Sequence, residues 1–216
     1  MNEGLYPQKN TDYRYLPFLE VKKLNVNEVL ERFRMAEYHY PDVIWHDLRS
    51  AKLKPKLTIE LVSLTSDEFK KILLSKLFLP NTITEQIAET LVVANDLNEM
   101  KLKLFDLFLG VGPIRQRIQT VMDMEGFDSC ITSQLLAAVK NDEYTIYHQN
   151  VVNGIEDFLA HVVDWEIIDL NVKTAENYLD FNELCKSIKN NFGFRSLGEL
   201  HEFFWHGHSS GWSFII

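Results

Sequence analysis

A hydroxyl or amide residue followed three positions later by glutamate recurs along this chain, each time just before a run of helix-forming residues. The pattern stands at NVNE (25–28), TSDE (65–68), TITE (82–85) and SLGE (196–199). Such a pair satisfies unpaired N–H groups at a helix N-terminus, one through the first side chain and one through the glutamate. Behind each pair, apolar residues recur every three or four positions, which is the spacing of an amphipathic helix. The sequence therefore predicts a mainly α protein.

Helix stops are as frequent as helix starts. Proline or glycine follows several of the periodic segments, and neither residue continues a helix easily. We expect Pro41 to end the first helix, and Gly154 to weaken a later one slightly. About eight helices are predicted, in the segments 25–40, 65–79, 82–110, 113–125, 129–139, 149–163, 174–191 and 196–206.

One segment alternates instead of following a helical period. In KPKLTIELVSL (54–64), Leu57, Ile59 and Leu61 fall on every second position, as the buried face of a strand would. We therefore expect an N-terminal extension, 1–64, with one helix and one or two short strands. It is expected to pack on a multi-helix domain formed by residues 65–216.

The composition is that of an ordinary globular protein, with 46% hydrophobic and 25% charged residues. The most apolar run, 155–163, is broken by polar residues, and no segment approaches the roughly 20 apolar residues that cross a bilayer. The first residues lack the pattern of a secretory signal. Cys130 and Cys185 each lie in an apolar helical pattern, which favours buried thiols in a reducing compartment. We expect a cytoplasmic protein that does not enter a membrane.

The net charge of −9 is spread unevenly. Residues 141–216 hold 12 Asp and Glu but only 4 Lys and Arg. An acidic surface repels phosphate, so we do not expect this third to bind nucleic acid. The segments 1–60 and 101–140 are each close to neutral, with one more basic than acidic residue, and they remain possible nucleic-acid faces.

GVGP (110–113) is one candidate for phosphate binding. Glycines before a helix leave N–H groups available for an anion, and Pro113 suits a helix start. Arg115 and Arg117 follow directly. The third glycine of a dinucleotide motif and the lysine of a phosphate-binding loop are both missing. A tight turn between two helices, with no ligand, explains the same residues.

Neither a metal site nor a catalytic set can be assembled from the sequence. His201, His206 and His208 lie close together near the C-terminus, but their spacing does not suit one helix face and no cysteine or second histidine pair stands nearby. His39 and His46 have no nucleophile beside them in sequence. We predict no metal, no cofactor and no identifiable catalytic residue.

Three stretches together resemble a known kind of protein. They are GVGPIRQRI (110–118), GFDSCITSQLLAAVKNDEYTIYHQNVVNGIEDF (126–158), and the pair NYLDFNELCKSI (177–188) and FGFRSLGELHEFFW (192–205). This set, within about 105–206, resembles a helical module of uncharacterised bacterial proteins and of restriction and defence proteins. Its middle part is similar to the helix-hairpin-helix segment of DNA-glycosylase-like folds. The resemblance implies a hairpin whose turn and following helix N-terminus hold a DNA phosphate.

Carried over to this chain, the hairpin turn falls at Gly126 and the second helix begins near Asp128 or Ser129. The second glycine of the turn is absent, and no carboxylate stands at 147–150, where the catalytic Asp of a glycosylase would fall. Tyr144 and Tyr147 are expected to anchor the next turn to the core. The predicted nucleic-acid-binding residues are Gly110, Gly112, Arg115, Arg117, Gly126 and Ser129.

Three functions follow from these observations. The first is a non-catalytic module that binds duplex DNA or another protein, of a restriction or phage-defence type. The second is a DNA-modifying or repair enzyme on a glycosylase-like fold. The third is an acidic, DNA-mimicking domain that binds a protein through the C-terminal third. The apolar end GWSFII (211–216) either docks on the body or contacts another chain.

Overall fold

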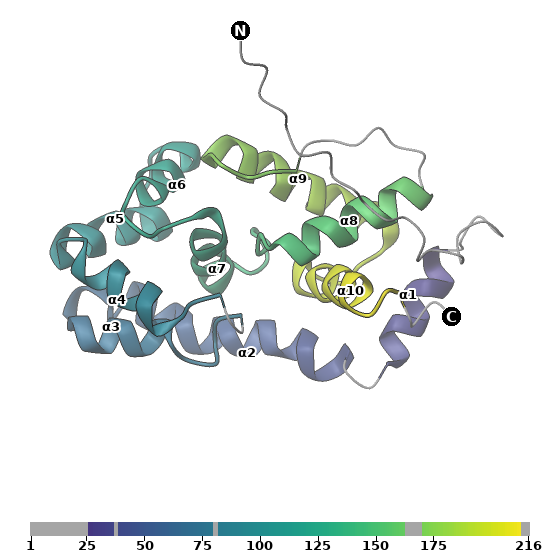
Figure 1. Cartoon of the computed structure of the whole chain (residues 1–216), viewed down its shortest axis with the longest axis horizontal. Helices are drawn as coiled ribbons and strands as arrows, with labels where there is room; N and C mark the ends of the chain where they lie inside the picture. Colours follow the sequence, from purple (N-terminus) through teal and green to yellow (C-terminus); the bar gives the residue numbers. More distant parts are fainter. Residues whose placement is uncertain (1–25, 37–38, 80–81, 163–169, 213–216) are drawn as a thin grey trace, which may run out of the picture.

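The computed structural model describes residues 26–36, 39–79, 82–162 and 170–212. These residues form ten α-helices and one short 3-10 helix, and they contain no strand. The mainly α fold is confirmed (Figure 1). The helices are α1 (Val26–Met35), α2 (His39–Thr58), η2 (Leu61–Ser63), α3 (Ser66–Leu73), α4 (Glu85–Val93), α5 (Leu97–Leu109), α6 (Ile114–Met122), α7 (Ser129–Val139), α8 (Gln149–Val162), α9 (Ala175–Phe192) and α10 (Leu197–Ser209).

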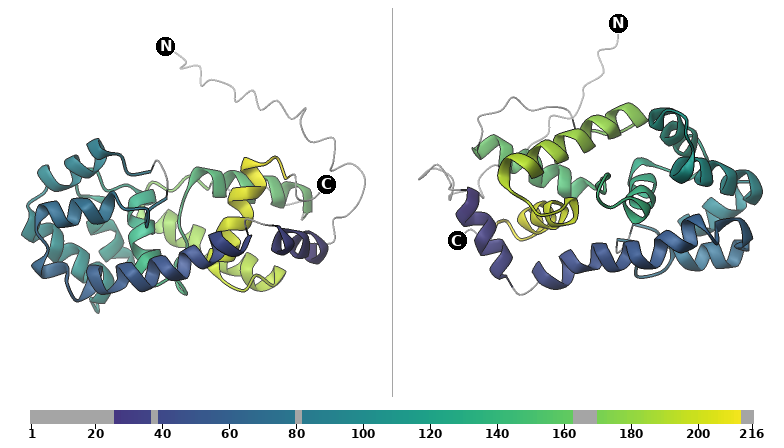
Figure 2. Two further views of the ribbon diagram at one scale, coloured as in Figure 1. Left: turned by 90° about the horizontal axis from the view of Figure 1, so that it is seen from below. Right: turned by 180° about the vertical axis from the view of Figure 1, so that it is seen from behind.

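The long helix α2 runs along one side of the molecule and connects its two ends (Figures 1 and 2). Helices α3 to α6 gather at one end, whereas α8, α9 and α10 gather at the other, and α7 lies between them. Ten of the eleven residues of α7 are buried, and none of them is charged. A helix without a charged face belongs in the interior, so α7 forms the middle of the core.

The predicted capping signals are largely correct. Thr65 and Glu68 form a complete capping box at the start of α3. The helix that TITE predicted begins at Glu85, and its cap is Thr84 rather than Thr82. At α10, the Ser196 side chain accepts the Glu199 N–H as expected. Residue 25, and with it the first predicted cap, lies outside the described residues.

The strand predicted within 54–64 is wrong. Residues up to Thr58 belong to α2, and η2 follows at Leu61–Ser63. Leu53, Leu57 and Leu61 are fully buried, whereas Ile59 is 84% exposed. The buried leucines thus recur every fourth residue, which is the spacing of one helix face. The alternation that suggested a strand included Ile59, whose side chain lies on the solvent side.

Pro41 does not end the first helix as predicted. Helix α1 ends at Met35, and Pro41 stands in the first turn of α2. Proline is tolerated there because the first N–H groups of a helix have no intrahelical acceptor. The sequence shows only that a helix is interrupted near Pro41. A proline at the start of a helix gives the same signal as a proline after its end.

Helices α8 and α10 approach each other very closely. A Cβ atom placed on Gly154 of α8 would lie 2.3 Å from the carbonyl oxygen of Phe204 of α10. Gly154 is therefore required for the packing of α8 on α10. The sequence indicated only that this glycine weakens its own helix slightly. One turn further along α10, the ring of Trp212 lies against Gly207. Trp212 is 8% exposed, so this part of the apolar end docks on the body, while residues 213–216 lie outside the described residues.

Tyr144 and Tyr147 anchor the segment between α7 and α8, as predicted. Both rings are buried. The Tyr147 hydroxyl accepts the N–H of Val172 at 3.2 Å, and the Tyr147 N–H donates to the Ser133 hydroxyl at 2.9 Å. These bonds tie the segment to α7 and to the chain just before α9.

The described part of the N-terminal extension shares the main core. Val29 and Phe33 of α1, and Leu53 and Leu57 of α2, belong to the same buried cluster as residues of α5, α7 and α10. The Arg34 guanidinium also donates to the Glu199 carboxylate at 2.8 Å, which joins α1 to α10. The division of the chain at residue 65 stays a prediction. No helix among the described residues is both long enough and apolar enough to span a membrane.

Candidate functional site

The six predicted nucleic-acid-binding residues form two groups rather than one. Gly110 and Gly112 precede α6, whereas Gly126 and Ser129 follow it. A helix of the length of α6 separates its ends by roughly 13 Å. Gly126 has a φ of 81°, which suits glycine, and Ser129 is buried behind the N-cap Asp128. The structure confirms a turn here but does not bring the two groups together.

The two arginines beside GVGP are both occupied by the protein itself. The Arg117 guanidinium donates to the carbonyl oxygens of Gly112, Asp106 and Leu107 at 2.9–3.0 Å. It thereby satisfies the C-terminal end of α5, where carbonyl groups lack intrahelical donors. Arg115 forms an exposed ion pair with Glu176 at the start of α9. Phosphate would have to displace these contacts.

A different surface lies on α5. Leu102, Phe105 and Leu109 recur at positions i, i+3 and i+7, and their exposed fractions are 68%, 41% and 50%. Val111 just beyond the helix is also fully exposed. Residues at this spacing share one face of a helix, and we call Leu102, Phe105 and Leu109 the α5 apolar face. Exposed apolar side chains that gather in this way mark contact sites more often than isolated ones do.

The second unusual group is buried where α2 meets α10. The His46 Nε2 atom of α2 lies 2.7 Å from Glu202 Oε1 of α10, and His201 Nδ1 lies 3.0 Å from the same oxygen. The His206 Nε2 atom lies 3.5 Å from the other oxygen, Glu202 Oε2. We call His46, His201, Glu202 and His206 the His–Glu cluster. Each of His46, His201 and Glu202 is less than a tenth exposed.

Gly198 makes room for His46. A Cβ atom at Gly198 would lie only 2.9 Å from the His46 ring. On the other side, the His46 ring meets the Trp45 ring edge-on, with ring centres 5.0 Å apart. The cluster therefore exists because α10 carries a glycine one turn before His201 and Glu202.

Burial sets the protonation of the cluster. Burial disfavours a charged imidazole and lowers the pKa of His46, although the Glu202 hydrogen bond opposes this shift. Burial alone would raise the pKa of Glu202. Hydrogen bonds from His201, His206 and His46 outweigh it and hold the Glu202 pKa well below its usual range. The cluster is therefore a carboxylate surrounded by imidazole N–H donors.

Two further aromatic groups extend the cluster. The Trp205 ring stacks on the His201 ring at 5.7 Å and lies 4.4 Å from the His148 ring. Burial, and then repulsion from His201, lower the pKa of His148 to about 4. His201 Nε2 is buried and has no hydrogen-bond partner among the described residues. Most buried polar atoms in proteins have a hydrogen-bond partner, so this nitrogen is an exception.

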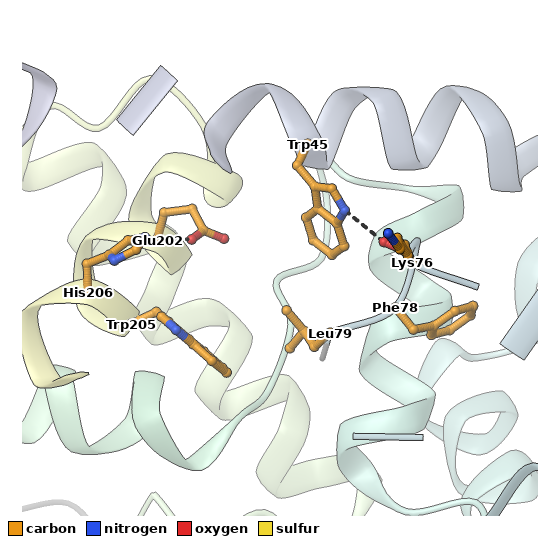
Figure 3. A pocket seen from close by; sticks show the side chains of 7 residues that line it. All are labelled: Trp45, Lys76, Phe78, Leu79, Glu202, Trp205 and His206. Carbon is orange, nitrogen blue, oxygen red and sulfur yellow. Dashed lines mark hydrogen bonds and ion pairs between the residues drawn. The ribbon is translucent and has the colours of Figure 1, made fainter. Parts of the chain in front are cut away.

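A pocket of about 280 Å³ opens beside the cluster (Figure 3). Glu202, Trp205 and His206 of α10 form one wall, and Trp45 of α2 faces them. The chain between α3 and α4 forms the other wall, where the Trp45 indole N–H donates to the Lys76 carbonyl at 3.2 Å. The pocket thus gives solvent a route to Glu202 and His206.

The histidines near the C-terminus divide into two groups. His201 and His206 belong to the cluster, whereas His208 contacts Asp157 and Asn153 of α8. The third imidazole, His46, comes from a residue 155 positions before His201. No motif in the sequence connects them, because their proximity depends on how α2 packs on α10. The one feature of the sequence that could have pointed to the cluster is Gly198, three residues before the pair His201 and Glu202.

Arg49, one turn after His46, is also buried. Its guanidinium donates to the carbonyls of Leu77 and Gln134, and it lies 5.4 Å from the Trp45 ring centre. Burial lowers the Arg49 pKa to about 9. Arg49 thereby fixes the wall of the pocket that Trp45 forms.

Comparisons with known proteins leave the site to be interpreted from its own geometry. No family model, no curated protein and no solved structure matches this chain.

Proposed function

We propose that this chain is a non-catalytic protein-interaction module whose docking surface is the α5 apolar face. The observation that carries the proposal is the exposure of Leu102, Phe105 and Leu109 on one side of a single helix. On the opposite side, Leu104, Leu107 and Phe108 are buried in the core. Helix α5 therefore has apolar residues on both sides, and a helix of this kind normally packs on both.

The partner that fits this face is a second copy of the same chain. Around a two-fold axis, two copies of α5 pack antiparallel, and the same patch must complement itself. In that arrangement Leu102 of one copy meets Leu109 of the other, and the two Phe105 rings lie near the axis. Lys103 and Asp106 stand one turn apart beside this face, and the Lys103 ammonium pairs with Glu99 of its own helix at 2.7 Å.

The expected dimer is weak. Three side chains cover much less than the roughly 800 Å² per partner of a stable complex. Val111 next to the face, and Val62, whose carbonyl accepts the Lys101 ammonium of α5 at 3.1 Å, add to the contact. We expect a monomer at low micromolar concentration and a dimer as the concentration approaches about 1 mM.

Binding of duplex DNA through a helix-hairpin-helix segment at α6 and α7 stays a prediction, as does a role in restriction or phage defence. The protein contact is preferred because the α5 face exposes its side chains, whereas Arg117 and Arg115 each hold protein partners. A DNA-mimicking role for the acidic C-terminal third is likewise a prediction that DNA-binding partner proteins would test.

The test is sedimentation or light scattering over that concentration range. The double variant Leu102→Glu, Phe105→Glu should remain monomeric throughout, because it places like charges where two apolar faces meet. Val93→Glu is the matched control, since Val93 is 73% exposed on a different helix, α4. The control should dimerise like the parent protein. A parent protein that stays monomeric near 1 mM, or a Val93→Glu variant that loses the dimer equally, contradicts the proposal.

A further inference from the structure

The His–Glu cluster has the atoms of a metal site. His46 Nε2 and His201 Nδ1 point at the same carboxylate oxygen, Glu202 Oε1, at 2.7 and 3.0 Å. One ligand atom from each of the three residues lies within 4.8 Å of the other two. We infer that His46, His201 and Glu202 bind a divalent transition-metal ion, with Zn²⁺ as the expected metal.

The donor set favours this class of ion. Two imidazole nitrogens and one carboxylate oxygen suit Zn²⁺, which binds nitrogen at about 2.0–2.1 Å and carboxylate oxygen at about 2.0–2.2 Å. Magnesium and calcium prefer oxygen ligands throughout. Two ligands at about 2 Å from one ion lie at most about 4 Å apart, and the two nitrogen–oxygen pairs of this cluster, at 2.7 and 3.0 Å, meet that limit.

The position of the ion would leave room for a further ligand. Zn²⁺ takes four ligands, and three come from the protein here. The pocket of Figure 3 reaches Glu202 and His206. His206 is on the same face of α10 as Glu202, four residues later, and its Nε2 lies 3.5 Å from Glu202 Oε2. The fourth ligand is therefore either His206 or a water molecule from the pocket.

A purely structural role explains the cluster less well. Removing polar groups from water costs free energy that hydrogen bonds only partly return, so apolar residues of similar size usually pack an interface at least as well. This cluster buries two imidazoles and a carboxylate. An arrangement of this kind is expected where the polar atoms bind something.

The surrounding charges are compatible with a cation. The buried guanidinium of Arg49, one turn from His46, donates to two backbone carbonyls. Lys76 and Glu202 both line the pocket, on opposite sides of Trp45 (Figure 3).

This inference replaces the sequence-based expectation of no metal. That expectation considered His201, His206 and His208, and the structure separates His208 from the other two. His46, which completes the set, reaches α10 only through the fold.

The test is metal content of the full chain, stripped with a chelator and then dialysed against Zn²⁺. We expect about one ion per chain in the parent protein. His46→Gln and Glu202→Gln keep the size and polarity of the side chains, and each should lower the affinity at least about 100-fold by removing a ligand. His208→Gln is the matched control, because it alters a histidine of the same helix outside the cluster. Replacing Zn²⁺ by Co²⁺ reports nitrogen and oxygen ligands by visible absorption.

The Zn²⁺ content of the parent protein and of the three variants decides whether the site exists. One equivalent of Zn²⁺ that His46→Gln and Glu202→Gln lose and His208→Gln keeps supports the site. Because the variants could weaken the fold, circular dichroism must show that each is helical, and the parent protein gives an independent reading: its unfolding temperature should rise with added Zn²⁺. A parent protein that binds no Zn²⁺, or a full equivalent retained in both cluster variants, overturns the inference.

Discussion

The turn before α6 and the His–Glu cluster differ in how their residues come together. Gly110, Gly112, Arg115 and Arg117 are neighbours in sequence and lie at the surface, where the arginines contact nearby carbonyls and a carboxylate. The cluster joins His46 of α2 to His201 and Glu202 of α10, and it is buried. The motif visible in the sequence thus serves a helix end, whereas the group with unusual chemistry is assembled by packing. Five substitutions test this difference.

The largest effect is expected from Glu202→Ala. It removes the carboxylate that holds His46, His201 and His206 and leaves buried donors without an acceptor, so stability should fall by about 3–5 kcal/mol. Urea unfolding of the metal-free protein measures the change. Glu183→Ala, on the exposed pair with Lys186, should cost about 0.5 kcal/mol or less. A loss below about 1 kcal/mol for Glu202→Ala would mean that the cluster is not held as described.

Gly154→Ala tests the close packing that positions α10. The new Cβ would lie 2.3 Å from the Phe204 carbonyl oxygen, so α8 must move away from α10. We expect a loss of about 1–3 kcal/mol, although alanine by itself favours a helix by about 1 kcal/mol. Gly112→Ala is the control, because a Cβ there would have nothing within 4 Å among the described residues. Equal unfolding midpoints for the two variants would contradict the close approach.

Arg117→Ala tests the surface motif. The variant loses two bonds to C-terminal carbonyls of α5 and a third to the Gly112 carbonyl, and we expect about 1–2 kcal/mol of destabilisation. Lysine keeps the positive charge but lacks the forked geometry of the guanidinium. Arg117→Lys should therefore lose less stability than Arg117→Ala, but should remain less stable than the parent protein. Denaturant unfolding monitored by circular dichroism distinguishes these cases. Full recovery by lysine would show that charge alone matters at this position.

His148→Gln should change how stability depends on pH. The unfolded imidazole has a pKa near 6.5, and in the folded protein it is lowered to about 4. Between these values the unfolded state binds a proton that the folded state does not, so stability falls as the pH falls from about 6.5 to about 4. The variant should therefore show a flatter curve over this range and little change at neutral pH. The measurement is the unfolding midpoint of the metal-free protein at steps of pH across this range. If the midpoints of the parent protein and of His148→Gln change with pH at the same rate, the lowered pKa of His148 is contradicted.

The smallest effect is expected from Arg115→Ala. Its ion pair with Glu176 is more than half exposed on both sides, and such pairs contribute about 0–1 kcal/mol. The same variant tests the DNA prediction, because binding to duplex DNA at low salt should weaken if Arg115 contacts phosphate and should fall as salt rises. Unchanged binding in this variant would remove Arg115 from any nucleic-acid surface.

Local signals predicted much of the secondary structure. Thr65, Thr174 and Ser196 cap helices as the sequence indicated, and of the two candidates Asp128 and Ser129 it is Asp128 that caps α7. Capping and helical periodicity depend on residues within one or two turns, so they can be recognised without knowing the fold. The prediction of a strand at 54–64 was wrong because alternation over a few residues also fits a helix when one apolar side chain, here Ile59, faces solvent.

The sequence by itself determined that this chain is helical, where most of its helices begin, and that Tyr144 and Tyr147 anchor the core. The tertiary structure alone decided that His46 meets Glu202, that Arg117 caps α5, and that Leu102, Phe105 and Leu109 stay exposed. The physical reason is the distance along the chain over which each interaction acts. Backbone hydrogen bonding and capping act between residues a few positions apart, whereas a buried polar cluster and an exposed apolar face depend on which helix faces pack together.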